Sequence, residues 1–180
     1  MNLPRRQHLL INFIVFQCAW FALVLGAAQN RVMLGLTAAA VAVLVHLWLA
    51  HRPLQELKLL LVALFIGTIW DSALAAHDVI RYPQQQWLPW LAPLWIMAMW
   101  ILFGTTLNVA LRFLHGRFTL AALFGAVGAP LSFLAGMRLQ ALQLPDLWLA
   151  CALLAIGWGV ILPLLLMLAR RFDGVEKDAS

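Results

Sequence analysis

One acidic side chain, Asp71, stands inside a long apolar run that extends from residue 59 to residue 76. We expect the other carboxylates to lie in loops or in the C-terminal tail. An ionisable group in hydrocarbon costs about 2.5 to 3.5 kcal/mol on insertion scales, so such residues usually face a bundle interior or a water-filled cavity. Asp71 is therefore the first candidate for a catalytic residue, as a proton acceptor or as a carboxylate that anchors a substrate. A structural hydrogen bond is the alternative.

Other polar side chains in the apolar runs fall into two layers when their depth is counted at about 1.5 Å per residue. The outer layer lies around Asp71 and consists of Thr68, Ser72, Trp20 and Ser132. The inner layer consists of Asn12, His46, Thr105 and Asn108, with Gln17 between the two layers. We predict that these residues, apart from His46, bind a substrate. A continuous polar track would suit a transporter, whereas separate interhelical hydrogen bonds, typically about 0.6 kcal/mol each, would only join helices.

No metal or cofactor is predicted. His77 and Asp78 follow the run that contains Asp71, but of the three only the two aspartates share a helical face, and they are seven residues apart. Cys18 and Cys151 lack a CxxC or Cys/His spacing, so we expect them to have a packing role and to form neither a zinc site nor a disulfide framework. The sequence also lacks the nucleophile-elbow, P-loop, dinucleotide and zinc-protease motifs. The familiar chemistries of soluble enzymes are therefore not supported.

The elements that hold these residues are predicted to be membrane-spanning helices. Hydrophobic residues make up 64% of the chain and charged residues 11%, with a mean hydropathy of +0.91, which leaves too few polar side chains to cover a water-soluble globule. Apolar runs of about twenty residues recur, as a helix needs to span hydrocarbon. The runs do not alternate, which favours helices over a barrel. We predict an all-α polytopic bundle, a single transmembrane domain over residues 1–180, with six helices at residues 9–27, 32–50, 59–76, 89–111, 118–136 and 147–169.

The positive charges between these runs predict an orientation. Nine of the lysines and arginines fall at one end of the bundle, and three fall at the other. By the positive-inside rule both termini lie in the cytoplasm, N-in and C-in, which agrees with an even number of spans. The formal charge of +5 is spread between apolar segments, so nucleic acid is not a predicted partner. We predict a multi-pass protein of a bacterial inner membrane.

Helix 118–136 carries small residues along one side and can approach a neighbour closely. Tight packing within the molecule is the favoured interpretation. A seam for a homo-oligomer or for another membrane protein is the alternative. The small residues are Gly125, Ala129, Ser132 and Gly136.

Four ordered motifs allow a comparison with known families: NFIVFQCAWFALVLGAA, WDSAL, PLWIMAMWILFGTTLNVALRFL and GAVGAPLSFLAGMRL. They resemble domain-of-unknown-function family 2878, small multi-pass bacterial inner-membrane proteins, and the resemblance runs over most of the chain. The chain departs from the family pattern at Ala110, where a serine is expected, and at Ala129, where a second glycine is usual. The resemblance implies no established activity, although members are often encoded near lipid-modifying enzymes, which favours a lipid-linked role by association only. It highlights Asn12, Gln17, Trp20, Asp71, Trp95, Trp100, Thr105, Thr106, Gly125, Gly128, Pro130 and Gly136.

These observations predict a polar pocket around Asp71 that opens toward the outer leaflet and handles a lipid or another hydrophobic small molecule. Three functional classes stay open. An enzyme would use Asp71 as acid or base, with Thr68, Ser72 and Trp20 positioning the substrate. A transporter would couple Asp71 to protons and use the inner polar layer as half of its path. An accessory subunit of a membrane lipid-modifying system would need neither and would dock through helix 118–136. Membrane lipids are the expected partners.

Overall fold

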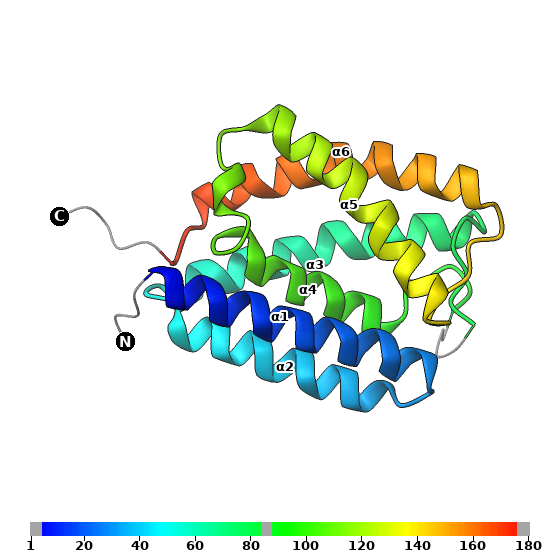
Figure 1. Ribbon diagram of the computed structural model, residues 1–180, viewed down its shortest axis with the longest axis horizontal. Helices are drawn as coiled ribbons and strands as arrows, with labels where there is room; N and C mark the ends of the chain where they lie inside the picture. The colour runs from blue at the N-terminus through cyan, green and yellow to red at the C-terminus, as the bar shows by residue number, and fades with distance from the viewer. Residues whose placement is uncertain (1–4, 84–87, 176–180) are drawn as a thin grey trace.

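The chain folds into a bundle of apolar helices (Figure 1). A computed structural model describes residues 5–83 and 88–175, and over these residues it contains six α-helices, one short 3-10 helix and no strand. The all-α architecture predicted from the sequence is thereby confirmed. The elements are α1 (Arg5–Ala28), α2 (Val32–Leu49), α3 (Pro53–Ala76), α4 (Leu94–Leu107), η1 (Arg112–Leu114), α5 (Phe118–Arg138) and α6 (Leu147–Arg171).

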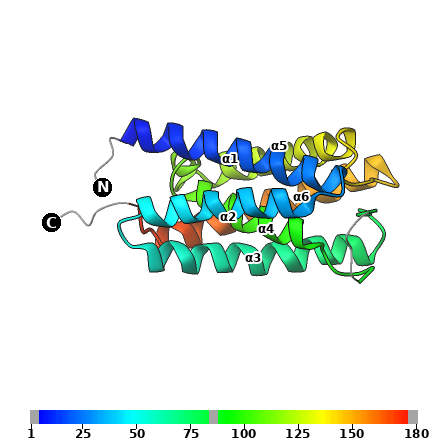
Figure 2. The same ribbon diagram turned by 90° about the horizontal axis from the view of Figure 1, so that it is seen from below.

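The helices form three antiparallel pairs, α1 with α2, α3 with α4, and α5 with α6. Helix α4 lies at the centre against α1, α2 and α3, whereas α5 packs chiefly on α6. The start of α1 and the end of α6 lie at the same end of the bundle in both views (Figures 1 and 2). The pair α5 and α6 is therefore the part of the bundle that has least backbone contact with the rest.

Five of the helices, all except α4, are long and apolar enough to cross a membrane. Helix α4 is equally apolar but has only 14 residues, which at about 1.5 Å per residue spans about 21 Å. Large apolar side chains point outward from the bundle, among them Leu44, Phe65 and Val160. An outer surface of this kind is suited to lipid and not to water.

Two helices differ from the predicted boundaries, and prolines account for both differences. Helix α3 begins at Pro53, not at residue 59, because proline has a φ angle and a missing N–H that suit the first turn of a helix. Helix α4 covers only the middle of the predicted segment 89–111. It begins after Pro93, which has extended backbone, and it ends at Leu107, before a turn and η1. The other helix ends lie within a few residues of their predicted positions.

Tryptophan side chains occupy grooves that glycines leave open between helices. A Cβ atom at Gly67 would lie 1.8 Å from Cδ2 of Trp100, so the indole of α4 sits directly on the backbone of α3. A Cβ at Gly157 of α6 would lie 2.1 Å from Cζ2 of Trp70, which joins α6 to α3. Helix α5 makes its predicted close approach to α6 at Gly125, where a Cβ would lie 2.3 Å from the carbonyl oxygen of residue 158.

Candidate functional site

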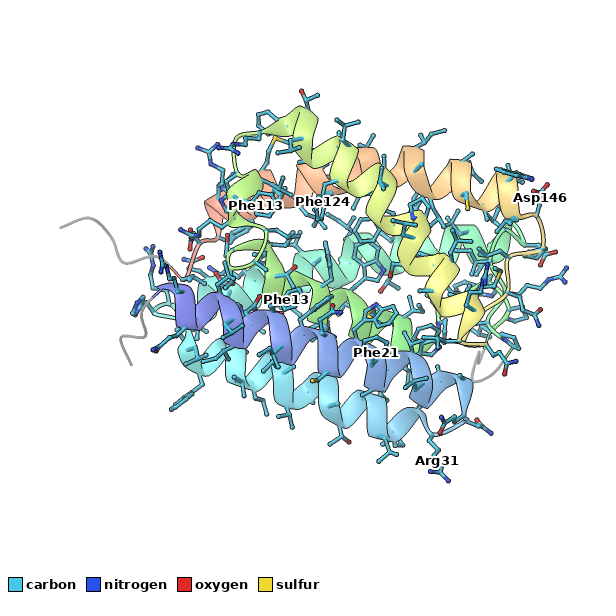
Figure 3. The ribbon with its side chains drawn as sticks, viewed as in Figure 1. Phe13, Phe21, Arg31, Phe113, Phe124 and Asp146 are labelled. Carbon is cyan, nitrogen blue, oxygen red and sulfur yellow. The ribbon has the colours of Figure 1, made fainter. Side chains whose placement is uncertain are left out.

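A cavity of about 610 Å³ lies between α1, α4, α5 and α6, and we call it the cleft. Its walls are mostly apolar and aromatic. Phe13 and Phe21 of α1 and Phe124 of α5 line it and are themselves exposed, and they lie on the opposing sides of the opening (Figure 3). The cleft thus reaches the outer surface between α1 and α5. A ligand could enter it sideways from the membrane.

Asp71 lies in the wall of the cleft, and only 1% of the residue is exposed. The indole Nε1 of Trp100 donates a hydrogen bond to Asp71 Oδ2 at 2.5 Å. The other carboxylate oxygen, Oδ1, is buried and has no hydrogen-bond partner among the described residues. One acceptor of the only carboxylate in this wall is therefore unused.

The Trp100 indole is itself held on several sides. It rests on Gly67, and it stacks on Trp158 of α6 with ring centroids 4.7 Å apart and planes at 16°. Phe103 contacts both tryptophans edge-on. Because close aromatic packing fixes the indole, its N–H is aimed at Asp71 before any ligand arrives.

Tyr82, in the connection from α3 to α4, packs behind the residues of this wall. It is buried, and its ring meets Trp95 edge-on with centroids 5.8 Å apart. Burial raises the pKa of Tyr82 well above its usual value, and the nearby Asp71 carboxylate raises it further. The phenol therefore keeps its proton and is a potential donor toward Asp71, although Tyr82 Oη has no partner at hydrogen-bonding distance among the described residues. The position of Tyr82 in a loop between two apolar runs gives no signal for this role in the sequence.

The predicted outer layer is only partly assembled at the cleft. Trp20 and Ser132 line it together with Asp71, and Gln17 lies in the same wall as Trp20. Ser72 instead accepts a hydrogen bond from the Ala92 backbone N–H at 3.0 Å and fixes the chain that enters α4. Thr68 does not line the cleft, and its buried hydroxyl has no partner in the described part of the chain.

The predicted inner layer lies elsewhere, nearer the end of the bundle where the termini are. Asn12 Nδ2 donates to the carbonyl of Thr105 at 3.0 Å, and both residues line a second, small cavity of about 10 Å³. Asn108 Nδ2 donates to Glu56 Oε1 at 2.8 Å. Among the described residues, Phe16 alone lines both cavities, and its side chain is apolar.

Glu56 corrects the expectation that Asp71 is the only carboxylate inside the bundle. It belongs to the first turn of α3, is completely buried, and lies with Oε2 2.9 Å from His46 Nε2. Its Oε1 accepts hydrogen bonds from Asn108 and from the Gly174 backbone N–H at 2.7 Å. Pro53 is the available sequence signal, because a helix that starts there includes Glu56 in its first turn.

The residues after α6 fold back over this carboxylate, and we call residues 172–174 the C-terminal clasp. The Arg52 backbone N–H donates to the Gly174 carbonyl at 2.9 Å, and Arg112 pairs with Asp173. A Cβ at Gly174 would lie 2.3 Å from the Arg52 carbonyl oxygen, so only glycine fits. The clasp joins the end of α6 to the start of α3 and to η1.

The residues considered as metal ligands lie apart from the cleft. Asp78 is exposed and binds the guanidinium of Arg81 through two contacts of 2.5 Å. In the described ranges no three His, Cys, Asp or Glu side chains come together as a metal site would require. Asp71 therefore faces the cleft without a second carboxylate or an imidazole beside it.

Apolar helices, a lipid-suited surface and a cleft open to that surface define a multi-pass helical membrane protein. More particularly, the chain belongs to the DUF2878 family, described as proteins of unknown function, which matches residues 9–164. No curated protein and no solved structure matches the chain significantly. Most positions highlighted by the family resemblance line the cleft, namely Gln17, Trp20, Asp71, Trp95, Trp100, Thr106, Gly125, Gly128 and Gly136.

Proposed function

We propose that this protein binds a membrane lipid or another hydrophobic small molecule in the cleft, with Asp71 as the polar anchor. One observation carries the proposal: a buried carboxylate with an unused oxygen stands in the wall of an apolar cavity of about 610 Å³. Small-molecule sites typically have volumes of about 300 to 1,000 Å³, apolar walls and few polar groups. An ionisable residue within a membrane-spanning helix usually marks a functional site.

The unused polar atoms indicate what the ligand carries. Asp71 Oδ1 needs a donor, whereas the indole N–H groups of Trp95 and Trp158, which also belong to residues of the cleft wall, need acceptors. A hydroxyl group can satisfy both needs because it donates one hydrogen bond and accepts others. The aromatic and aliphatic walls suit a hydrocarbon body. We propose a hydrophobic alcohol or a lipid with a small hydroxylated head group.

The place of the site in the membrane is part of the proposal. We propose a bacterial inner membrane with both ends in the cytoplasm, which the nine-to-three distribution of lysine and arginine supports. Asp71 then lies toward the outer leaflet, since it is in the half of α3 that is remote from the termini. The opening between α1 and α5 allows exchange with that leaflet. The separation of the two cavities favours binding over passage of a polar cargo across the bundle.

Native mass spectrometry with lipid analysis tests the proposal on protein purified gently from its own membrane. In Asp71→Asn, the amide N–H group lies either at the position of the unused acceptor or opposite the N–H of Trp100. In both cases the binding geometry changes, so the retained molecule should be lost or strongly depleted. Asp78→Asn is the matched control, because it removes an exposed carboxylate in the turn that follows α3, and this carboxylate does not line the cleft. Both variants are compared at equal helical content.

A second variant tests the volume of the cleft independently of charge. A Cβ at Gly128 meets no atom within 4 Å, and the residue lines the cleft, so Gly128→Leu should fill space without disturbing the helices. It should reduce ligand retention as Asp71→Asn does. Equal retention of the same lipid in wild type and both cleft variants would refute a site at Asp71.

A further inference from the structure

The small cavity at the end of the bundle near the termini contains unused polar atoms of its own. His46 Nδ1 and Asn12 Oδ1 are buried without a hydrogen-bond partner in the described structure, and both residues line the cavity. His46 and Asn12 are each more than nine-tenths buried. The cavity measures about 10 Å³, close to the size that holds one water molecule. A water there would supply the missing partner to both side chains.

The other nitrogen of His46 reaches the buried carboxylate. His46 Nε2 lies 2.9 Å from Glu56 Oε2, so the imidazole stands between the cavity and a fully buried negative charge. In its neutral form with the proton on Nε2, the ring donates to Glu56 and leaves a lone pair on Nδ1. A second proton on Nδ1 would convert the pair from net −1 to net zero.

His8 connects this cavity to the surface. It lines the cavity, and it is only partly buried near the start of α1. Charged and titratable groups around the pair come from every neighbouring element. They are His8 of α1, His51 and Arg52 between α2 and α3, Arg112 of η1, and Asp173 of the C-terminal clasp.

We propose that His46, Glu56 and one water in the small cavity form a proton-binding site that exchanges with the aqueous phase through His8. A proton from bulk water reaches the cavity water through His8. The cavity water then gives one proton to His46 Nδ1 and is again a neutral water molecule. Glu56 remains a carboxylate throughout. The site is separate from the cleft and does not depend on a ligand bound there.

Nitrogen NMR of ¹⁵N-histidine-labelled protein in lipid nanodiscs tests this site. The His46 ring nitrogen signals should report exchange of the ring proton with water. Asn12→Leu fills the cavity and should slow exchange of the His46 ring proton with water by about tenfold, which corresponds to about 1.4 kcal/mol. His51→Gln, which changes an exposed histidine that does not line the cavity, should leave the exchange rate unchanged.

A second variant keeps the test decisive if Asn12→Leu fails to fold. His8→Gln changes a partly exposed residue and should also slow the exchange, because it removes the titratable group at the mouth of the cavity. A His46 ring proton that does not exchange with water in the wild-type protein would overturn the proposal. So would exchange that is equally fast in wild type and in His8→Gln.

Discussion

Replacing Trp100 with phenylalanine should destabilise the bundle by removing the donor to Asp71. Interhelical hydrogen bonds in membranes average about 0.6 kcal/mol. This bond is expected to be stronger because its acceptor is a carboxylate, for which about 1.5 to 3 kcal/mol is typical. Only 1% of Asp71 is exposed and its other oxygen has no partner in the described residues, so the Trp100 indole is the one donor at hydrogen-bonding distance there. We therefore expect a hydrogen-bond contribution of about 1.5 to 3 kcal/mol.

A double-mutant cycle separates this contribution from lost ring packing. Trp100→Phe, Asp71→Leu and the double variant are compared by reversible unfolding in mixed micelles with increasing SDS. Once Asp71 is leucine, the Trp100 substitution should cost only packing. The coupling energy is the difference between the two costs, and it should equal about 1.5 to 3 kcal/mol.

Trp158 provides the matched control. Its ring stacks on Trp100 and has the same size, but its Nε1 has no hydrogen-bond partner in the described chain. Trp158→Phe should therefore lose packing and show no coupling to Asp71. A Trp100 coupling below about 0.5 kcal/mol, the usual scatter of additive sites, would refute the role assigned to the indole N–H. Equal coupling for both tryptophans would attribute the effect to ring packing.

Four further substitutions test the packing, the C-terminal clasp and a pH response. Gly157→Ala should cost about 1 to 3 kcal/mol in the same unfolding assay, because its Cβ would lie 2.1 Å from the Trp70 ring. Gly128→Ala, with nothing within 4 Å, should cost nothing and can add up to about 1 kcal/mol through helix propensity. Gly174→Ala should loosen the C-terminal clasp and speed limited proteolysis near the end of α6. Burial lowers the pKa of His115, so the unfolded state binds more protons and stability should fall as pH drops below about 6.5. His115→Gln should flatten that dependence in pH-resolved unfolding.

Hydrophobic patterning was sufficient to predict the fold class, because uninterrupted apolar runs in a lipid solvent must satisfy their own backbone hydrogen bonds. The exceptions are the starts of α3 and α4. There Pro53 extends a helix beyond its apolar run, and Pro93 delays one within it. A hydropathy window averages over such single residues. Proline chemistry at the first helical turn is the information it omits.

The candidate site was predictable in part. Asp71 stands out because its type contradicts its surroundings, and Trp20 follows from counting depth along a neighbouring helix. Depth does not give rotation about the helix axis, which is why Thr68 and Ser72 were grouped with a cavity that they do not line. Trp100 as the donor to Asp71 depends on Gly67, and no pattern along the sequence relates two positions on separate helices.

The two buried carboxylates differ in how completely the protein surrounds them, and this difference separates their roles. Glu56 has partners on both oxygens, from His46, Asn108 and Gly174, so no acceptor is left for an added molecule. Asp71 has a partner on one oxygen only, and it stands beside a large apolar volume. An unsatisfied buried acceptor costs about 1 to 3 kcal/mol, and a ligand that supplies the donor recovers that free energy on binding. The cost left at Asp71 thus becomes a source of affinity, whereas Glu56 has no free acceptor for a ligand and only the ring protons of its neighbour His46 exchange there.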